Sequence, residues 1–223
     1  MVKVAANRSA KAYSRRNAFR GSARRFLLVC EGQTEKAYFD QLKSVLRGLT
    51  VKTLHGHTDP ISIVQLAQRY MDGDPRRGIE PDAYDEIWAV FDWDEHTNEV
   101  RQAISMARRS QIHVALSNPS FEVWLTWHYD NFMRIGCNQD LAHHALIRRW
   151  PEYVKGDNTN FTALFSKHQL FSAMERASQA RQRHNAEGRE FPENRPSSDV
   201  DLLIKNLIES WQIAHPESPF PLL

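Results

Sequence analysis

The clearest fold signal in the sequence is Phe26-Leu-Leu-Val-Cys-Glu31-Gly32, in which an acidic residue directly follows an uninterrupted apolar run. An apolar run of this length, bounded by a turn signal, is typical of a strand buried on both faces of a parallel sheet. The stretch Ile87-Trp-Ala-Val-Phe91 repeats the pattern and ends in Asp92-Trp93-Asp94. With two further segments, the sequence predicts strands over residues 25–30, 49–55, 87–91 and 112–116.

Helical patterns separate these strands. Apolar residues recur at helical spacing over residues 37–46, and Asp59-Pro60 is a capping pair that opens a second helix. Thr97 and Pro119 open two more. This alternation predicts an α/β fold with a mainly parallel sheet of four to five strands flanked by helices.

The second half of the chain has a different pattern. From about residue 131 the strand signal disappears, and helical spacing covers residues 141–150, 161–187 and 199–214. We therefore expect a helical C-terminal half that packs on the sheet. The expected organisation is a basic flexible arm over 1–24, an α/β domain over 25–130, and a helical region over 131–223 on the same core.

The composition fits a globular protein. A chain of 223 residues with 41% hydrophobic and 25% charged residues can form a sizeable core and is too apolar to be wholly disordered. No apolar stretch approaches the about 20 residues of a membrane span, and because no apolar run follows Met1 we expect no secretory signal. Cys30 and Cys137 are too few for a disulfide scaffold or a thiolate zinc site. We expect a soluble, cytoplasmic protein with no membrane partner.

Positive charge is concentrated at the start of the chain. The first 25 residues hold eight Lys or Arg and no acidic residue, whereas the net charge of the whole chain is only +2. A basic segment on an acidic body is suited to binding a polyanion, since each phosphate contact releases counterions. Arg15, Arg16, Arg20 and Arg24 are the predicted nucleic-acid contacts. The alternative is a basic tail that only aids solubility.

Carboxylates follow two of the predicted strands. Glu31 comes after the first strand, and Asp92 and Asp94 come after the third. Ligands of open α/β sheets bind at the carboxyl ends of strands, and carboxylates brought together there repel unless a cation lies between them. Oxygen ligands without Cys or His favour Mg²⁺ over Zn²⁺. Glu35, one helical turn after Glu31, is a further candidate ligand. Taken singly, each motif is also compatible with an ordinary turn or a solvated loop.

Three other residues are candidates. Glu122 follows Pro119 near the end of the fourth strand, where it is either a metal ligand or a residue that favours the helix dipole. Lys155 is predicted to contact nucleic acid and neutralise phosphate charge, and Trp93 to stack on a base. The pair His55-Gly-His57 is too small to form a metal site.

These residues resemble a known signature. A strand-end Glu31 with a strand-end Asp92-Trp93-Asp94 is similar to the signature of the TOPRIM domain. More narrowly, Cys30-Glu-Gly-Gln-Thr-Glu35 and Ser117-Asn-Pro-Ser-Phe-Glu-Val-Trp124 resemble the RloB-like family, a TOPRIM branch found beside restriction–modification genes. Tyr153-Val-Lys-Gly156 and Asn194-Arg-Pro-Ser-Ser-Asp-Val200 look like its later blocks, so the resemblance spans most of the chain.

The resemblance implies a metal-dependent catalytic site. Glu31, Asp92 and Asp94 would be catalytic, with the two aspartates holding Mg²⁺ (or Mn²⁺). Glu31 would complete the metal site or act as general acid/base, and Glu35 would be a second-metal ligand. Many TOPRIM domains have a third Asp, or a Gly, where this chain has His96. The third carboxylate is therefore displaced to Glu95 or absent, and the number of metals stays open.

We expect a Mg²⁺-dependent nuclease that hydrolyses phosphodiester bonds of DNA or RNA. The family's genetic neighbourhood implies a prokaryotic anti-phage, restriction-linked defence system and a partner protein from the same operon. Two alternatives stay open: a non-cleaving nucleic-acid-binding or regulatory subunit of such a system, and a nucleotide phosphotransferase. The choice between DNA and RNA, the trigger and the oligomeric state do not follow from the sequence.

Overall fold

The fold is a layered α/β structure around one sheet. The computed structural model describes residues 24–56, 59–93, 97–156 and 159–221. Within them, five strands form a sheet of order β2-β1-β3-β4-β5. The first four strands are parallel, and β5 is antiparallel to β4. The strands are β1 (Arg25–Cys30), β2 (Thr50–His55), β3 (Glu86–Asp92), β4 (His113–Asn118) and β5 (Ser197–Ser198).

Seven α-helices lie among the described residues, and they confirm the predicted helical segments. Asp59 caps its helix as expected, because its Oδ1 accepts a hydrogen bond from the backbone N–H of Ser62 (2.8 Å). Two short 3₁₀ helices span Pro75–Arg77 and Thr162–Phe165. The α-helices are α2 (Gln33–Val45), α3 (Pro60–Asp72), α4 (Thr97–Arg109), α5 (Phe121–Trp127), α6 (Gln139–Arg149), α7 (Lys167–Ala186) and α8 (Val200–Ala214).

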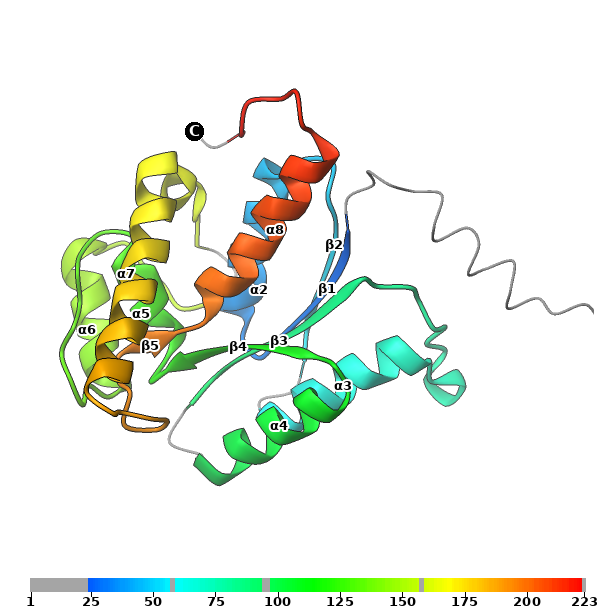
Figure 1. Cartoon of the computed structure of the whole chain (residues 1–223), viewed down its shortest axis with the longest axis horizontal. Coiled ribbons are helices and arrows are strands. Elements are labelled where there is room, and N and C mark those ends of the chain that lie inside the picture. The colour runs from blue at the N-terminus through cyan, green and yellow to red at the C-terminus, as the bar shows by residue number, and fades with distance from the viewer. Residues whose placement is uncertain (1–23, 57–58, 94–96, 157–158, 222–223) are drawn as a thin grey trace, which may run out of the picture.

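The helices cover the two faces of the sheet unequally (Figure 1). Helices α3 and α4 pack on one face, whereas α2 and α5–α8 cover the other. Alternate residues of β1 therefore enter different cores: Phe26 and Leu28 contact the larger group, and Leu27 and Val29 contact α3 and α4. Because both faces are covered, the central strands β1 and β3 are mostly apolar and buried, whereas the edge strand β2 carries polar residues and is partly exposed. The helical C-terminal half shares its core with the sheet, as predicted.

Strand β5 was not predicted. It lies in the polar stretch before α8 and pairs Ser198 with Ser117 and Ser197 with Asn118. The hydroxyl oxygens of Ser117 and Ser198 are 3.2 Å apart. A strand of two polar residues has no periodicity to detect, and only its contact with β4 makes it a strand. This pairing brings the segment before α8 to the carboxyl-terminal end of the sheet.

Several predicted residues lie outside the described ones. These are Asp94, Glu95 and His96 after β3, and Arg15, Arg16 and Arg20 in the first 23 residues. Over the described part of the chain, every helix is too short or too polar to cross a lipid bilayer.

Candidate functional site

Glu31 and Asp92 meet at the carboxyl-terminal end of the sheet. Strands β1 and β3 are neighbours, with Cys30 opposite Val90. The backbone N–H of Glu31 donates to the carbonyl of Val90 (2.9 Å), and the backbone N–H of Asp92 donates to Oε2 of Glu31 (3.0 Å). The strand that ends at Glu31 and the strand that carries Asp92 are therefore adjacent, which brings the two acidic strand ends together.

The Asp92 carboxylate is buried, and its two oxygens differ in their hydrogen bonding. Its Oδ2 accepts a hydrogen bond from the backbone N–H of Phe121 (3.1 Å), at the start of α5. Its Oδ1 is buried and has no hydrogen-bond partner among the described residues. Burial raises the pKa of Asp92 well above its ordinary value, and the charges of Glu35, Glu122 and Glu31 raise it further.

Glu35 comes from the first turn of α2 and is 5% exposed. Burial, together with the charge of Glu122, raises the pKa of Glu35 to about 7. Its Oε2 also lacks a hydrogen-bond partner in the described part of the chain. A Cβ atom added to Gly32 would lie 2.2 Å from this oxygen, so the glycine leaves room for the carboxylate.

A loop after α6 brings a cation to these acids. Lys155 Nζ lies 3.6 Å from Oε1 of the buried Glu122, and the Tyr153 hydroxyl donates to the same oxygen (3.1 Å). The backbone N–H of Gly156 donates to Oγ1 of Thr34 (2.8 Å), which ties the loop to α2. Partial burial lowers the pKa of the lysine, but the charges of Glu122 and its acidic neighbours outweigh this and raise it.

A cavity of about 240 Å³ is lined by Glu31, Glu35, Asp92 and Lys155, among others. Two of its lining residues were not among the predicted site residues: His55, which was set aside with His57 as too small a metal site, and Gln139. His55 ends β2 beside β1, and its Nδ1 lies 3.3 Å from Nε2 of Gln33. Its place at a strand end was a usable signal, whereas Gln139 on α6 comes from a distant segment and gave none. The lining residues are Glu31, Gly32, Glu35, His55, Asp92, Gln139 and Lys155.

Two predicted nucleic-acid contacts lie elsewhere. Arg24 is at the amino-terminal end of β1, where its guanidinium pairs with Glu86. Trp93 is only 7% exposed, its indole N–H donates to Oγ1 of Thr97 (2.9 Å), and the guanidinium of Arg195 lies over its ring. A base could reach the Trp93 ring only if Arg195 moved. That both residues contact nucleic acid stays a prediction.

The described residues do not by themselves form a closed metal site. Among them, no group of three or more His, Cys, Asp or Glu side chains is arranged to hold a metal ion. The predicted ligand Asp94 lies outside the described residues. The unpartnered oxygens of Asp92 and Glu35 are of the chemical type that binds a hard cation, and that a cation binds here stays a prediction.

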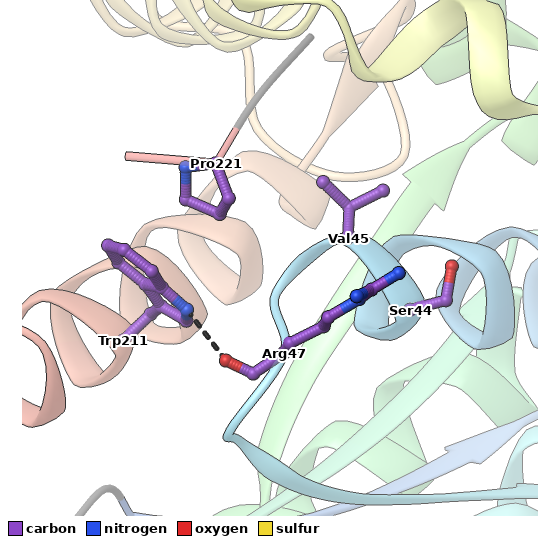
Figure 2. A pocket seen from close by; sticks show the side chains of 5 residues that line it. All are labelled: Ser44, Val45, Arg47, Trp211 and Pro221. Carbon is purple, nitrogen blue, oxygen red and sulfur yellow. Dashed lines mark hydrogen bonds between the residues drawn. The ribbon is translucent and has the colours of Figure 1, made fainter. Parts of the chain in front are cut away.

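A larger cavity of about 430 Å³ has a different character (Figure 2). It lies between the end of α2 and helix α8, at the amino-terminal end of the parallel strands, and none of its lining residues is acidic. The indole N–H of Trp211 donates to the carbonyl of Arg47 (2.9 Å) across it. Its lining is Ser44, Val45, Arg47, Trp211 and Pro221. The acidic cavity is therefore the stronger candidate for a catalytic site, although it is the smaller one.

The fold and the acidic strand ends define an α/β protein with a charged site at the carboxyl-terminal end of its sheet. Residues 26–207 match the family described as RloB-like protein, and the chain belongs to this family. The match includes the acidic cluster and Lys155. No curated protein and no solved structure matches the chain.

Proposed function

We propose that the protein is a Mg²⁺- or Mn²⁺-dependent nuclease that hydrolyses phosphodiester bonds at the acidic cavity. One observation carries this proposal: two buried carboxylate oxygens, Asp92 Oδ1 and Glu35 Oε2, have no partner among the described residues although other acids surround them. Burying like charges together is costly, and a bound divalent cation would remove the cost.

The pattern of the acids supports the same activity. The pattern of Glu31 after one strand and Asp92-Trp93-Asp94 after another is similar to the TOPRIM signature, and this resemblance implies a metal-dependent catalytic site. In this proposal Asp92 and Asp94 hold the cation, and Glu35 and Glu122 are further ligands. A bound divalent cation polarises the scissile phosphate and stabilises the charge that develops on its oxygens.

The chain's own residues supply position and charge. Glu31 is held in place by the backbone N–H of Asp92, where it acts as general acid/base in hydrolysis. Water attacks phosphorus, the bond to the leaving oxygen breaks, the base takes a proton from the water, and the leaving oxygen gains one. Lys155 places a positive charge at the rim, where it would attract a phosphate into an otherwise acidic cavity.

The basic residues before β1 supply sequence-independent affinity in this proposal. Arg15, Arg16 and Arg20 belong to the segment in which Lys and Arg occur without acidic residues. Deleting residues 1–23 should weaken binding to nucleic acid and flatten its dependence on salt, while leaving the acidic cavity unchanged. The role in defence and the operon partner belong to the same proposal and rest on the family's genetic neighbourhood.

The direct test is cleavage by the purified protein. Plasmid DNA, single-stranded DNA and total tRNA are incubated with Mg²⁺ or Mn²⁺ and resolved on a gel. The expected result is cleavage of at least one polymer that EDTA abolishes. Binding without cleavage under every condition would instead identify a non-cleaving subunit. Turnover of nucleoside triphosphates without polymer cleavage would identify a phosphotransferase.

A further inference from the structure

A second cation lies at the same end of the sheet as the acidic cavity. A segment that we call the strap, residues 187–196, joins α7 to β5. The side-chain amide of Asn118, at the end of β4, donates to the carbonyl of Pro192 (3.1 Å) and to Oδ1 of Asn194 (2.8 Å). The backbone N–H of Gly136 donates to the carbonyl of Arg195 (3.3 Å). These bonds fix the strap against the carboxyl-terminal end of the sheet.

Arg195 extends from the strap over Trp93. Its guanidinium carbon lies 4.7 Å from the centre of the indole ring, and Phe191 of the same strap packs edge-on against that ring. The side chain of Arg195 is 20% exposed. An arginine stacked on an aromatic ring and held by its own backbone loses little entropy when it binds a ligand.

Arg195 and Lys155 lie on opposite faces of the sheet. Asp92 contacts α5 on the side of the larger core, whereas the next residue, Trp93, packs with α3 and α4. Successive residues of an extended chain point to opposite faces, so Arg195 follows Trp93 to the α4 side. Lys155 reaches Glu122 from the α5 side. The two cations therefore flank the ends of the strands that carry the acids.

The guanidinium N–H groups of Arg195 have weaker partners than those of an arginine in a structural ion pair. Its Nε is buried and without a partner among the described residues, and its ion pair with the exposed Glu193 is long, at 3.7 Å. By contrast, Arg149 makes two bonds to Asp130 (3.0 and 2.6 Å). A guanidinium that is held in place but weakly paired is suited to binding a phosphate through two of its N–H groups.

We propose that Arg195, held on Trp93 by the strap, binds a backbone phosphate of a nucleic-acid strand that crosses the carboxyl-terminal end of the sheet. This inference rests on the proposed function, and it assigns the two flanking phosphates of the substrate to Lys155 on one face and Arg195 on the other. Trp93 is then the support for the guanidinium and not a surface for a base.

The test measures binding separately from cleavage. Affinity for labelled single-stranded and duplex DNA and RNA is measured by fluorescence anisotropy over a range of salt, with Asp92→Asn as the background so that the probe stays intact. Adding Arg195→Gln should weaken binding about 10-fold at low salt and reduce the salt slope by about one. The matched control is Arg47→Gln, which removes an exposed arginine side chain at the other end of the sheet (Figure 2). Equal effects of the two changes would overturn the inference.

A second variant does not depend on how well Arg195→Gln folds. Glu193 is 71% exposed and competes with phosphate for Arg195, so Glu193→Gln should tighten binding about 2-fold. Glu209→Gln is its control, since Glu209 is an exposed acid on α8 that pairs with Lys205. Equal affinities of the Glu193 and Glu209 variants would count against the inference.

The two proposals fail in different ways. If the wild-type protein cleaves nucleic acid and Arg195→Gln changes neither the cleavage rate nor the affinity, the phosphate site at Arg195 is refuted and the nuclease proposal stands. Binding that depends on Arg195 in a protein that cleaves nothing keeps the phosphate site and removes the nuclease. A wild-type chain that binds no polymer removes both.

Discussion

The two ends of the parallel sheet differ in whether their acidic side chains are paired with basic ones. At the amino-terminal end, basic and acidic side chains pair: Arg24 contacts Glu86, and Arg25 lies 2.9 Å from Asp82. At the carboxyl-terminal end, Asp92 and Glu35 are buried close to other acids, and burial and like charge raise the pKa of both. The same strands therefore end in balanced charge on one side and in concentrated negative charge on the other.

The difference separates structural from functional charge. Half-exposed pairs such as that of Arg25 and Asp82 contribute at most about 1 kcal/mol each, and their loss is tolerable. A buried cluster of acids lowers stability, and a fold retains such a cost where the charges have a use. Four predictions test this difference between the two ends of the sheet, and the one with the largest expected effect comes first.

Asp92→Asn should remove the largest amount of activity. It keeps the shape of the side chain but removes the charge proposed to hold the cation, so cleavage should fall on the order of 10³-fold. Gel assays of product formation measure it. Asp82→Asn makes the same change at the paired end and should leave the rate within about twofold. An Asp92→Asn protein that cleaves at the wild-type rate would show that the site is wrongly assigned.

Glu35→Gln should stabilise the metal-free protein above neutral pH. The folded pKa of about 7 exceeds the unfolded value of 4.5, so the folded state binds the extra proton. Its contribution is complete below the unfolded pKa and is lost as pH rises through about 7, a loss of up to about 3 kcal/mol. Urea unfolding without divalent ions, at about pH 5 and about pH 8, measures the change. The advantage of the variant should appear only at the higher pH; an equal advantage at both would contradict the raised pKa.

Lys155→Ala should slow cleavage about 10- to 100-fold, because the acidic cavity loses the cation that attracts phosphate. Lys155→Arg should restore part of the rate. Lys205→Ala is a matched control, since both lysine side chains are 64% exposed and each lies near one glutamate. The measurement is the steady-state cleavage rate of the three variants. Equal rates for the two alanine variants would show that Lys155 does not contribute to cleavage.

Gly32→Ala should have the smallest effect. The added methyl group would displace the Glu35 carboxylate and reduce cleavage about 3- to 10-fold. In a Glu35→Ala background the methyl group has no carboxylate to displace, so the two changes should not be additive. Additive effects would show that the glycine acts through something other than Glu35.

Sequence reasoning was most successful for elements with strong periodicity. The apolar runs of β1 and β3 placed Glu31 and Asp92 correctly at the ends of neighbouring strands, because buried parallel strands need continuous apolar residues. Periodicity could not predict β5, whose two serines carry no pattern, or the position of His55 at the acidic cavity, which depends on the strand order. Arg24 was assigned by its charge, yet its partner Glu86 begins the neighbouring strand β3, about sixty residues later in the sequence.

The α/β class, the acidic strand ends and membership of the RloB-like family could be predicted from the sequence, because local periodicity and short motifs lie in consecutive residues. The proximity of Lys155 to Glu122 and the stacking of Arg195 on Trp93 became visible only in the folded chain. These pairs join segments far apart in the chain, and their contact depends on how the helices pack over the sheet.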